Sequence, residues 1–541
     1  MDEKEGKEDE QSLFWADQVA GKVAQRDRFH FLDKPAPKQK EFVIKAANSV
    51  SGVLHIGRLS DIIRSESVYR ALLEQGHKAR LIFVFDDMDP LRRIPEGVPK
   101  SYEEHIGKPI SRIPDFDGCH QSYSSHFIEE YMKVLHKFVT EKLETYSMSE
   151  EYRKGSFAPF IKKLLERHAD LVQIQNRHRK EPLRSDWCPW APVCGQCGRL
   201  ITPRFLGMED GKVQYECRDY QFEKHTALGC RHRGTSDPAK ADGKLFYKGE
   251  LAAQWAYWKV SCEGWGKEYQ VPGSAFWING EIAERVLNYP MPVPFFYEHI
   301  MVDNVKMSAS LGNVVYPREW LEVADPELLR FLYNKRLMTT RSFSWKELPN
   351  LYEEHDKAAQ IYHGEMKLEN EKEQRHVKRL YEISSIGKPK VPVRLGYAHA
   401  GMLAQVFSSK EDIIKSLKKT GHYQKEAEAG LLSRVEKARA WVTTRAPEEA
   451  RFALQEKPYT QGLSDKQKKA LSMLAEFLGK HGMDENSLSQ QIYSICEEVG
   501  LEPKEFYKGA YTALLNREKG PRLVTLLIAT GEKSARLLKA I

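Results

Sequence analysis

Two apolar runs near the start of the chain, with an amphipathic stretch between them, predict a β-α-β unit. Residues 41–46 and 79–85 are rich in apolar and β-branched side chains, which is typical of buried strands. Between them, apolar residues recur at roughly helical spacing from Gly57 to about Leu73, and Gly76 is a natural helix stop. Because such a unit normally forms a parallel crossover, the pattern predicts an α/β fold with a doubly wound parallel sheet.

The rest of the chain divides where this pattern changes. After about residue 350 the sequence is rich in Ala, Lys, Glu and Leu with little strand signal, which predicts helices. We therefore expect five parts: the first half of the α/β domain with a helical insertion at about 122–180 (1–185), a cysteine-rich insertion (186–242), the second half of the α/β domain (243–301), a loop followed by helices (302–350) and an all-helical C-terminal domain (351–541).

Length and charge agree with a large protein that carries little excess charge. At 541 residues the chain is long enough for roughly three or four domains. Its 83 basic and 76 acidic residues leave a net charge of +7, which is mild for a nucleic-acid-binding protein. No stretch approaches the ~18 consecutive apolar residues of a membrane span, and the charged start does not resemble a signal peptide. We expect a cytoplasmic protein without a membrane segment.

The segment His55-Ile56-Gly57-Arg58 lies where the first predicted strand turns into a helix. The carboxyl end of such a strand is where doubly wound folds bind ligands, and a helix N-terminus there offers N–H groups and a positive dipole end to phosphates. Gly57 allows close approach, and His55 can stabilise charge that develops on a phosphate. The alternative is a helix-capping turn with an exposed histidine.

A second segment, Lys306-Met307-Ser308-Ala309-Ser310, precedes Leu311-Gly312-Asn313 and has the composition of an adaptable loop. The ammonium group of Lys306 on such a loop could meet negative charge on a ligand, and it would speed a reaction if that charge grows in the transition state. The alternative is a solvated surface turn.

Five of the eight cysteines fall between Cys188 and Cys230, which indicates a metal site more than disulfides. Cys194 and Cys197 form a Cys-x-x-Cys-Gly knuckle, and Cys217 and Cys230 complete a tetrahedral set for structural Zn²⁺. Cys188, His225 or His232 could replace a member of the second pair. A reduced cysteine cluster without metal is a further alternative.

With these segments in view, the chain resembles the class I lysyl-tRNA synthetases from about residue 12 to past residue 400. The His55 segment resembles their HIGH motif and the Lys306 segment their KMSKS motif. The stretches Asp86-Asp87-Met88-Asp89-Pro90-Leu91-Arg92 and Gly118-Cys119-His120 are specific to that family. The resemblance implies a Rossmann-like catalytic domain, activation of lysine by ATP and Mg²⁺, transfer of lysine to the 2′-hydroxyl of the terminal adenosine of tRNA, and an anticodon-binding helical domain.

Site residues follow from the same resemblance. It implies catalytic roles for His55, Gly57, Lys306 and Ser308, and ATP contacts from these and from Ser49, Ser51, Met307 and Ser310. It implies an amino-acid pocket formed by Ala47, Ser49, Glu250, Trp255, Glu268, Tyr269 and Tyr297. A buried lysine ammonium needs a carboxylate partner, and we favour Glu268 because it precedes Tyr269. The alternative is a surface ion pair between Glu268 and Lys267.

Several positions depart from the family pattern. Ala47-Asn48-Ser49 replaces Gly-x-Thr, Glu268-Tyr269 replaces Asp-His, and Ala309 replaces the second lysine of the loop. Two alternatives therefore stand beside lysine ligation: a paralogue with another specificity or a binding role, and a synthetase for glutamate or glutamine. In the helical region five basic residues are candidates for contacts with tRNA phosphates: Lys410, Lys415, Lys418, Lys419 and Arg434. A helical bundle that binds another protein would have the same sequence pattern.

Overall fold

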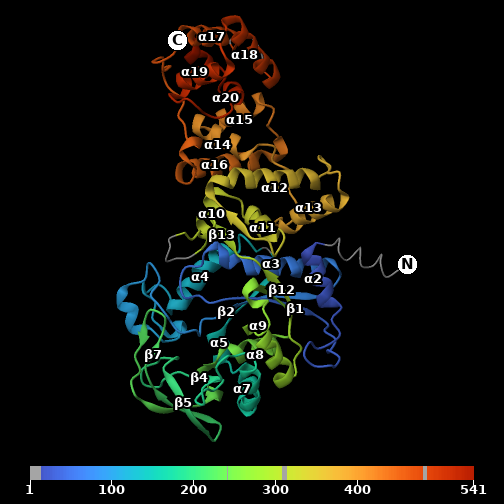
Figure 1. Cartoon of the computed structure of the whole chain (residues 1–541), viewed down its shortest axis with the longest axis vertical. Coiled ribbons are helices and arrows are strands. Elements are labelled where there is room, and N and C mark those ends of the chain that lie inside the picture. The colour runs from blue at the N-terminus through green and yellow to red at the C-terminus, as the bar shows by residue number, and fades with distance from the viewer. Residues whose placement is uncertain (1–13, 140, 241, 308–312, 479–483) are drawn as a thin grey trace, which may run out of the picture. The chain divides into compact units, whose positions relative to one another are not determined.

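Figure 1 shows a computed structural model of the chain. The structure describes residues 14–139, 141–240, 242–307, 313–478 and 484–541. The chain forms two compact units. The first comprises residues up to 317 together with 329–342 and 370–388, and the second comprises 318–328, 343–369 and 389–541.

The first unit is built on a five-stranded parallel sheet with the strand order β12-β11-β1-β2-β3. Its strands are β1 (Phe42–Asn48), β2 (Ala79–Phe85), β3 (Leu143–Ser147), β11 (Val260–Gly266) and β12 (Val293–Tyr297). The chain moves outward from β1 through β2 to β3, then returns to the other side of β1 through β11 and β12. The predicted α/β fold with a parallel sheet is confirmed, and the predicted strands and helix match β1, β2 and α3 (Ile56–Glu74).

Helices cover both faces of this sheet because successive side chains of each strand point to opposite faces. Val43 of β1 packs with Ile82 and Val84 of β2 in a large core that also contains Trp255 and Phe276. On the opposite face, α2 and α3 pack against each other and α3 packs against β1. The helices of this unit are α2 (Trp15–Ala24), α3, α4 (Tyr123–Leu135), α5 (Met148–Arg153), α6 (Ala158–Glu166), α7 (His168–Asn176), α8 (Tyr247–Trp258), α9 (Ala275–Ile282) and α13 (Glu371–Ser384).

The segment expected to be a helical insertion, residues 122–180, also contributes a strand to the sheet. It contains α4, α5, α6 and α7, but β3 lies between α4 and α5 and pairs with β2. The side chains of β3 are half-buried or exposed and include Glu144, Thr145 and Ser147. An edge strand with so few apolar residues lacks the signal by which a buried strand is found.

The cysteine-rich insertion consists of short antiparallel strands. Strands β5, β6 and β9 form one sheet, β4 pairs with β10, and β7 pairs with β8. Their bounds are β4 (Trp190–Pro192), β5 (Pro203–Glu209), β6 (Lys212–Cys217), β7 (Tyr220–Gln221), β8 (Thr226–Ala227), β9 (Arg233–Ser236) and β10 (Gly243–Leu245).

From Trp345 onward, the elements in the described part of the second unit are all helices. They are η7 (Trp345–Glu347), α12 (Leu348–Tyr362), α14 (Tyr397–Val406), α15 (Lys410–Lys419), α16 (Glu428–Thr444), α17 (Asp465–Leu478), α18 (Glu485–Val499), α19 (Pro503–Leu515), α20 (Leu523–Thr530) and α21 (Glu532–Lys539), with short 3₁₀ turns between them. Within the described residues, no helix is both long and apolar enough to cross a membrane.

A fully buried ion pair joins distant segments of the first unit. Arg330 pairs with Glu66 of α3, and the side chains of both residues are 0% exposed. The Arg330 guanidinium also donates to the carbonyl oxygens of Phe138, Ile383 and Ser384. One side chain therefore satisfies groups from three separate parts of the chain.

We expect Arg330→Met to lower the free energy of unfolding of the first unit by about 3–5 kcal/mol, because it leaves a buried carboxylate without its cation. Urea unfolding followed by circular dichroism measures the change. Lys133→Met is the control, since Lys133 forms only exposed ion pairs on α4 and its loss should leave the midpoint nearly unchanged. Equal midpoints for the two variants would contradict the importance of the buried pair.

Candidate active site

A cavity of about 760 Å³ lies at the carboxyl ends of β1 and β11, next to the N-terminus of α3. The strand order reverses between these two strands, and open parallel sheets bind ligands at such a switch point. Nine residues implied by the family resemblance line it: Ala47, Ser49, His55, Gly57, Glu268, Tyr269, Tyr297, Lys306 and Met307.

Of the remaining implied residues, Ser51, Glu250 and Trp255 have described positions and do not line this cavity. Trp255 is fully buried and donates its indole N–H to Glu263, so it acts on the cavity only through that carboxylate. Ser51 is exposed, and its carbonyl oxygen accepts a hydrogen bond from the hydroxyl of Tyr123. Ser308 and Ser310 lie outside the described residues.

His55 caps the helix that follows it. Its Nδ1 accepts the backbone N–H of Gly57 at 3.1 Å, so a neutral ring carries its proton on Nε2. Burial, aided by the nearby charge of Arg58, lowers the pKa of His55 to about 4. The side chain is therefore a neutral N–H donor at physiological pH.

The N-terminus of α3 was expected to offer its backbone N–H groups to phosphates, and the structure differs from this expectation. Its first N–H groups already have acceptors: Ile56 donates to the carbonyl oxygen of Val315, and Arg58 donates to that of His55. These groups are not free for a phosphate in this structure. The donors that line the cavity at this turn belong to side chains, namely His55 Nε2 and the guanidinium group of Arg58.

Gly57 is required by close packing between the two motif segments. A Cβ atom at this position would lie 2.8 Å from the His55 ring and 2.9 Å from the Met307 terminal methyl group. A side chain at this position would therefore displace the His55 ring or the end of the Met307 side chain. This contact brings together residues that are 250 positions apart in the sequence.

A β-hairpin positions Lys306. Strands β13 (Ile300–Val302) and β14 (Val305–Lys306) pair antiparallel, with Lys306 opposite Met301. The two turn residues, Asp303 and Asn304, both have positive φ values, as a tight two-residue hairpin turn requires. Lys306 is exposed and lines the cavity, so its ammonium group can reach a ligand there.

Glu268 lies at the edge of the cavity with its carboxylate half-exposed. It bonds to His299 Nε2 at 3.0 Å, while Lys267 pairs with Glu298 at 2.7 Å. The alternative of a Glu268–Lys267 pair therefore does not describe this structure.

Charge is unbalanced at one side of the cavity. Lys244 lies 2.8 Å from a carboxylate oxygen of Asp89 and 2.9 Å from one of Glu250, which also accepts the hydroxyl of Tyr152. A third carboxylate, Asp86, has a buried oxygen with no hydrogen-bond partner in the described structure. Burial, followed by the charges of Asp89 and Glu250, raises the pKa of Asp86 to about 7.

A second group of buried charges, at β1 and β11, also contains more carboxylates than cations. Lys45 and Glu263 form an ion pair whose side chains are almost completely buried. Asp61 accepts the N–H of Ala47 through one oxygen at 3.3 Å, but its other oxygen is buried with no partner among the described residues. Burial, followed by the charge of Glu263, raises the pKa of Asp61 to about 7.

Two buried carboxylates thus face this cavity without a cation of their own. An unpaired buried charge is costly, so the part of the cavity beside these carboxylates favours a ligand group that brings positive charge, whereas Arg58, Arg92 and Lys306 line the cavity as well.

Sequence reasoning missed Lys45, Asp61 and Glu263. A lysine within the apolar strand 41–46 was the available signal, because such a residue is seldom buried unless paired. Asp61 lies four residues after Gly57, and hence on the same helix face, which marks it as a neighbour of the motif.

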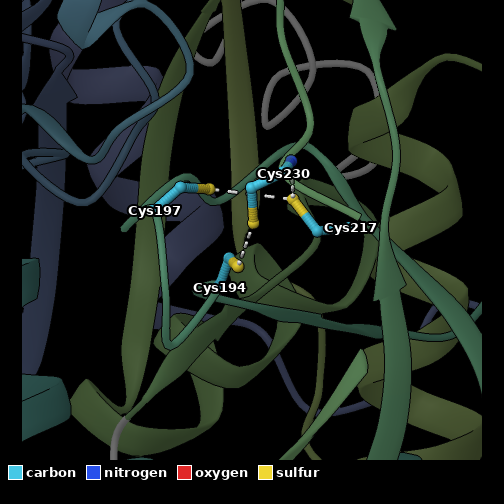
Figure 2. A group of neighbouring side chains, drawn as sticks. All are labelled: Cys194, Cys197, Cys217 and Cys230. Carbon is cyan, nitrogen blue, oxygen red and sulfur yellow. Dashed lines mark hydrogen bonds between the residues drawn. The ribbon is translucent and has the colours of Figure 1, made fainter. Parts of the chain in front are cut away.

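The four cysteines of the insertion converge, as Figure 2 shows. Their sulfur atoms all lie within 4.8 Å of one another, with Cys194 and Cys230 3.6 Å apart and Cys197 and Cys217 3.7 Å apart. Tyr215 braces the knuckle by accepting the N–H of Gly195. Among the described residues, Cys188, His225 and His232 are not part of this group. The four thiols could hold a tetrahedral metal with no open position.

Comparison with known proteins agrees with these features. A family described as tRNA synthetases class I (K) matches residues 13–387. The chain is 26% identical to a lysine–tRNA ligase of Methanosphaera stadtmanae, covering 96% of this chain and 97% of the relative. It is 29% identical to that of Methanocaldococcus jannaschii (96% and 98%) and 30% identical to that of Methanopyrus kandleri (97% and 98%). The chain belongs to the class I tRNA synthetases of the K type.

Proposed function

We propose that this chain joins lysine to tRNA in two steps. A carboxylate oxygen of lysine attacks the α-phosphorus of ATP, which forms lysyl-adenylate and releases pyrophosphate. The 2′-hydroxyl of the terminal adenosine of tRNA then attacks the adenylate carbonyl carbon, and AMP leaves. Family membership supports the reaction class, and the cytoplasm supplies its substrates. The observation that carries the choice of lysine is the pair of uncompensated carboxylates, Asp61 and Asp86, in the cavity.

On the nucleotide side, His55 and Lys306 act on the phosphates. The neutral His55 ring donates from Nε2, while the Lys306 ammonium group meets negative charge as it moves onto pyrophosphate. Mg²⁺, bound with the ATP phosphates, supplies further neutralisation of charge. Ala309 leaves no second lysine in the loop, so this role depends heavily on Lys306.

On the amino-acid side, the two ammonium groups of lysine match Asp61 and Asp86. Each carboxylate has a buried oxygen that lacks a donor in the described structure, and the positive charge of the substrate supplies one. Tyr269 and Tyr297 line the same cavity and provide aromatic walls. We assign Glu268, which is half-exposed and bonded to His299, to the cavity entrance.

The tRNA would be held by the helical C-terminal domain. Lys410, Lys415, Lys418 and Lys419 are all exposed on α15 and are suited to phosphate contacts. Arg434, expected to join them, is instead buried and paired with Asp356. We propose a structural Zn²⁺ at the four cysteines, where it would fold the insertion.

Pyrophosphate exchange, screened over all twenty amino acids, tests the function. Exchange that depends on lysine supports it. Exchange with glutamate or glutamine, or none at all, would favour the alternatives.

We expect Lys306→Ala to slow adenylate formation on the order of 10²–10³-fold while changing ATP affinity little, because the charge contact forms as pyrophosphate leaves. Single-turnover kinetics with saturating ATP and lysine measure the chemical step. Lys212→Ala, which removes an exposed lysine of the insertion, is the control. An unchanged chemical step in Lys306→Ala would contradict this role.

We expect Asp61→Asn to raise KM for lysine between about 30- and 5 × 10³-fold, since loss of a buried charge partner costs about 2–5 kcal/mol. The KM for ATP should change little. Glu268→Gln is the comparison variant and should have the smaller effect on KM for lysine.

The pH dependence provides an independent readout. A cationic ligand binds the ionised carboxylates, and their pKa values near 7 mean that protonation competes with lysine as the pH falls below 7. For wild type, kcat/KM for lysine should therefore decline below pH 7, and the decline should be shallower in Asp61→Asn. Parallel profiles would show that Asp61 does not contact the substrate.

We expect Cys194→Ser to lose one zinc ion per chain and to make the insertion sensitive to proteolysis, because structural zinc binding is coupled to folding. Elemental analysis after chelator washing measures the metal. Cys496→Ser, which changes a buried cysteine of α18 outside the cluster, should keep the wild-type zinc content. Unchanged zinc content in Cys194→Ser would refute the site.

A further inference from the structure

Another cavity, of about 770 Å³, lies at the amino ends of β1, β2 and β11. Phe42 and Val260, the first residues of β1 and β11, line it, as does Lys78, which precedes β2. The candidate active site lies at the carboxyl ends of β1 and β11, so these seven-residue strands separate the two cavities by about 20 Å. No residue to which we give a role in the proposed reaction lines this second cavity.

Positive charge dominates the wall of this cavity, which we call the basic cavity. Asp27 is the only carboxylate among the described residues that line it. Arg28 is paired with Asp33, which lies outside the lining. The lining lysines are exposed and have no ion-pair partner in the described part of the chain. An anionic ligand would offset this excess of cations. Five lining residues carry a positive charge: Arg26, Arg28, Lys38, Lys40 and Lys78.

Arg26 is the most buried of these cations, with a side chain that is only 17% exposed. Its Nε donates to the carbonyl oxygen of Arg28 at 3.3 Å, but its Nη2 is buried and has no hydrogen-bond acceptor among the described residues. A carboxylate oxygen of Glu284 lies 3.8 Å from Nη2, too far for a hydrogen bond. The fold therefore compensates the charge of Arg26 only in part, and an anion in the basic cavity would compensate it further. The Glu284 carboxylate already accepts the backbone N–H groups of His30, Phe31, Leu32 and Met291.

Hydrogen bonds hold one side of the basic cavity in place. Gln39 lies between two of the lysines in the sequence, and its side-chain oxygen accepts the hydroxyl of Ser261 at 2.8 Å. Its amide group donates to the hydroxyl of Tyr289 at 3.2 Å, and that hydroxyl donates to the carbonyl oxygen of Val260 at 2.9 Å. The segment that carries these lysines is thus attached to β11, which lowers the cost of ordering it around a ligand.

We propose that the basic cavity binds a small anion with at least two phosphate groups, either inorganic pyrophosphate or the polyphosphate of a nucleotide. An arginine can bind phosphate oxygens in a bidentate manner, and lysines around it supply point charges. One phosphate group carries a charge of only about −1.5 to −2 at pH 7, which is less than three lysines and an arginine can neutralise. The volume lies within the roughly 300–1,000 Å³ of small-molecule sites. A cavity with its arginine below the surface suits a small molecule better than the continuous backbone of tRNA.

Hydrogen–deuterium exchange of the full chain with added inorganic pyrophosphate locates the binding, and the proposal does not rest on the proposed function. Peptides that cover residues 25–42 and 76–78 should be protected. Lys38→Ala combined with Lys78→Ala should weaken binding there at least about tenfold, because two charge contacts are lost. Both lysines are exposed, so we expect this variant to fold. Lys22→Ala combined with Lys212→Ala removes the same charge from exposed positions outside the cavity and should keep wild-type protection.

ATP, inorganic phosphate and tRNA, each added alone, identify the ligand. Stronger protection of residues 25–42 by ATP than by pyrophosphate would assign the site to a nucleotide, and equal or weaker protection would assign it to pyrophosphate. Protection by inorganic phosphate at the same concentration as by pyrophosphate would overturn the requirement for two phosphate groups. The proposal as a whole would be overturned by no protection with pyrophosphate or ATP, by protection with tRNA alone, or by equal pyrophosphate affinity in wild type and the Lys38→Ala, Lys78→Ala variant.

Discussion

The ion pair between Lys45 and Glu263 is the constraint on which the site depends. These residues are direct partners in the pairing of β1 and β11, and their side chains are buried where the strand order reverses. Because alternate residues of a strand point to opposite faces, a slip of one residue would bury each charge without its partner. The pair therefore fixes the register of the two strands whose ends form the cavity. Because Lys45 is paired with Glu263, it donates no hydrogen bond to Asp61, which keeps one buried oxygen without a partner among the described residues.

Local patterns predicted the centre of the fold well. Strands β1 and β2 and helix α3 follow from apolar runs and helical spacing, since each is buried on at least one face. β3 escaped prediction because an edge strand with polar side chains needs only its neighbour's backbone. Between residues 318 and 388 the chain passes several times from one unit to the other. The spacing of apolar residues does not predict this division.

The candidate site was predictable only in part. Short motifs pointed to His55, Gly57 and Lys306, and all three residues line the cavity. The contacts of Glu250 with Lys244 and of Trp255 with Glu263 depend on which strands meet, and no local pattern contains that information. The knuckle cysteines were found by their spacing. The sequence also selected Cys217 and Cys230, but excluding Cys188, His225 and His232 from the group required the fold of the insertion.

The hydrogen bond between Ile56 and Val315 also links the segment that carries His55 to the residues that follow the Lys306 segment. The N–H of Ile56, at the head of α3, donates to the carbonyl oxygen of Val315, which follows the loop that begins at Lys306. Displacement of Val315 would therefore uncover a backbone N–H donor beside His55. The number of N–H groups that the head of α3 can offer to a ligand is thus set by a residue that lies far away in the sequence, beyond the second motif.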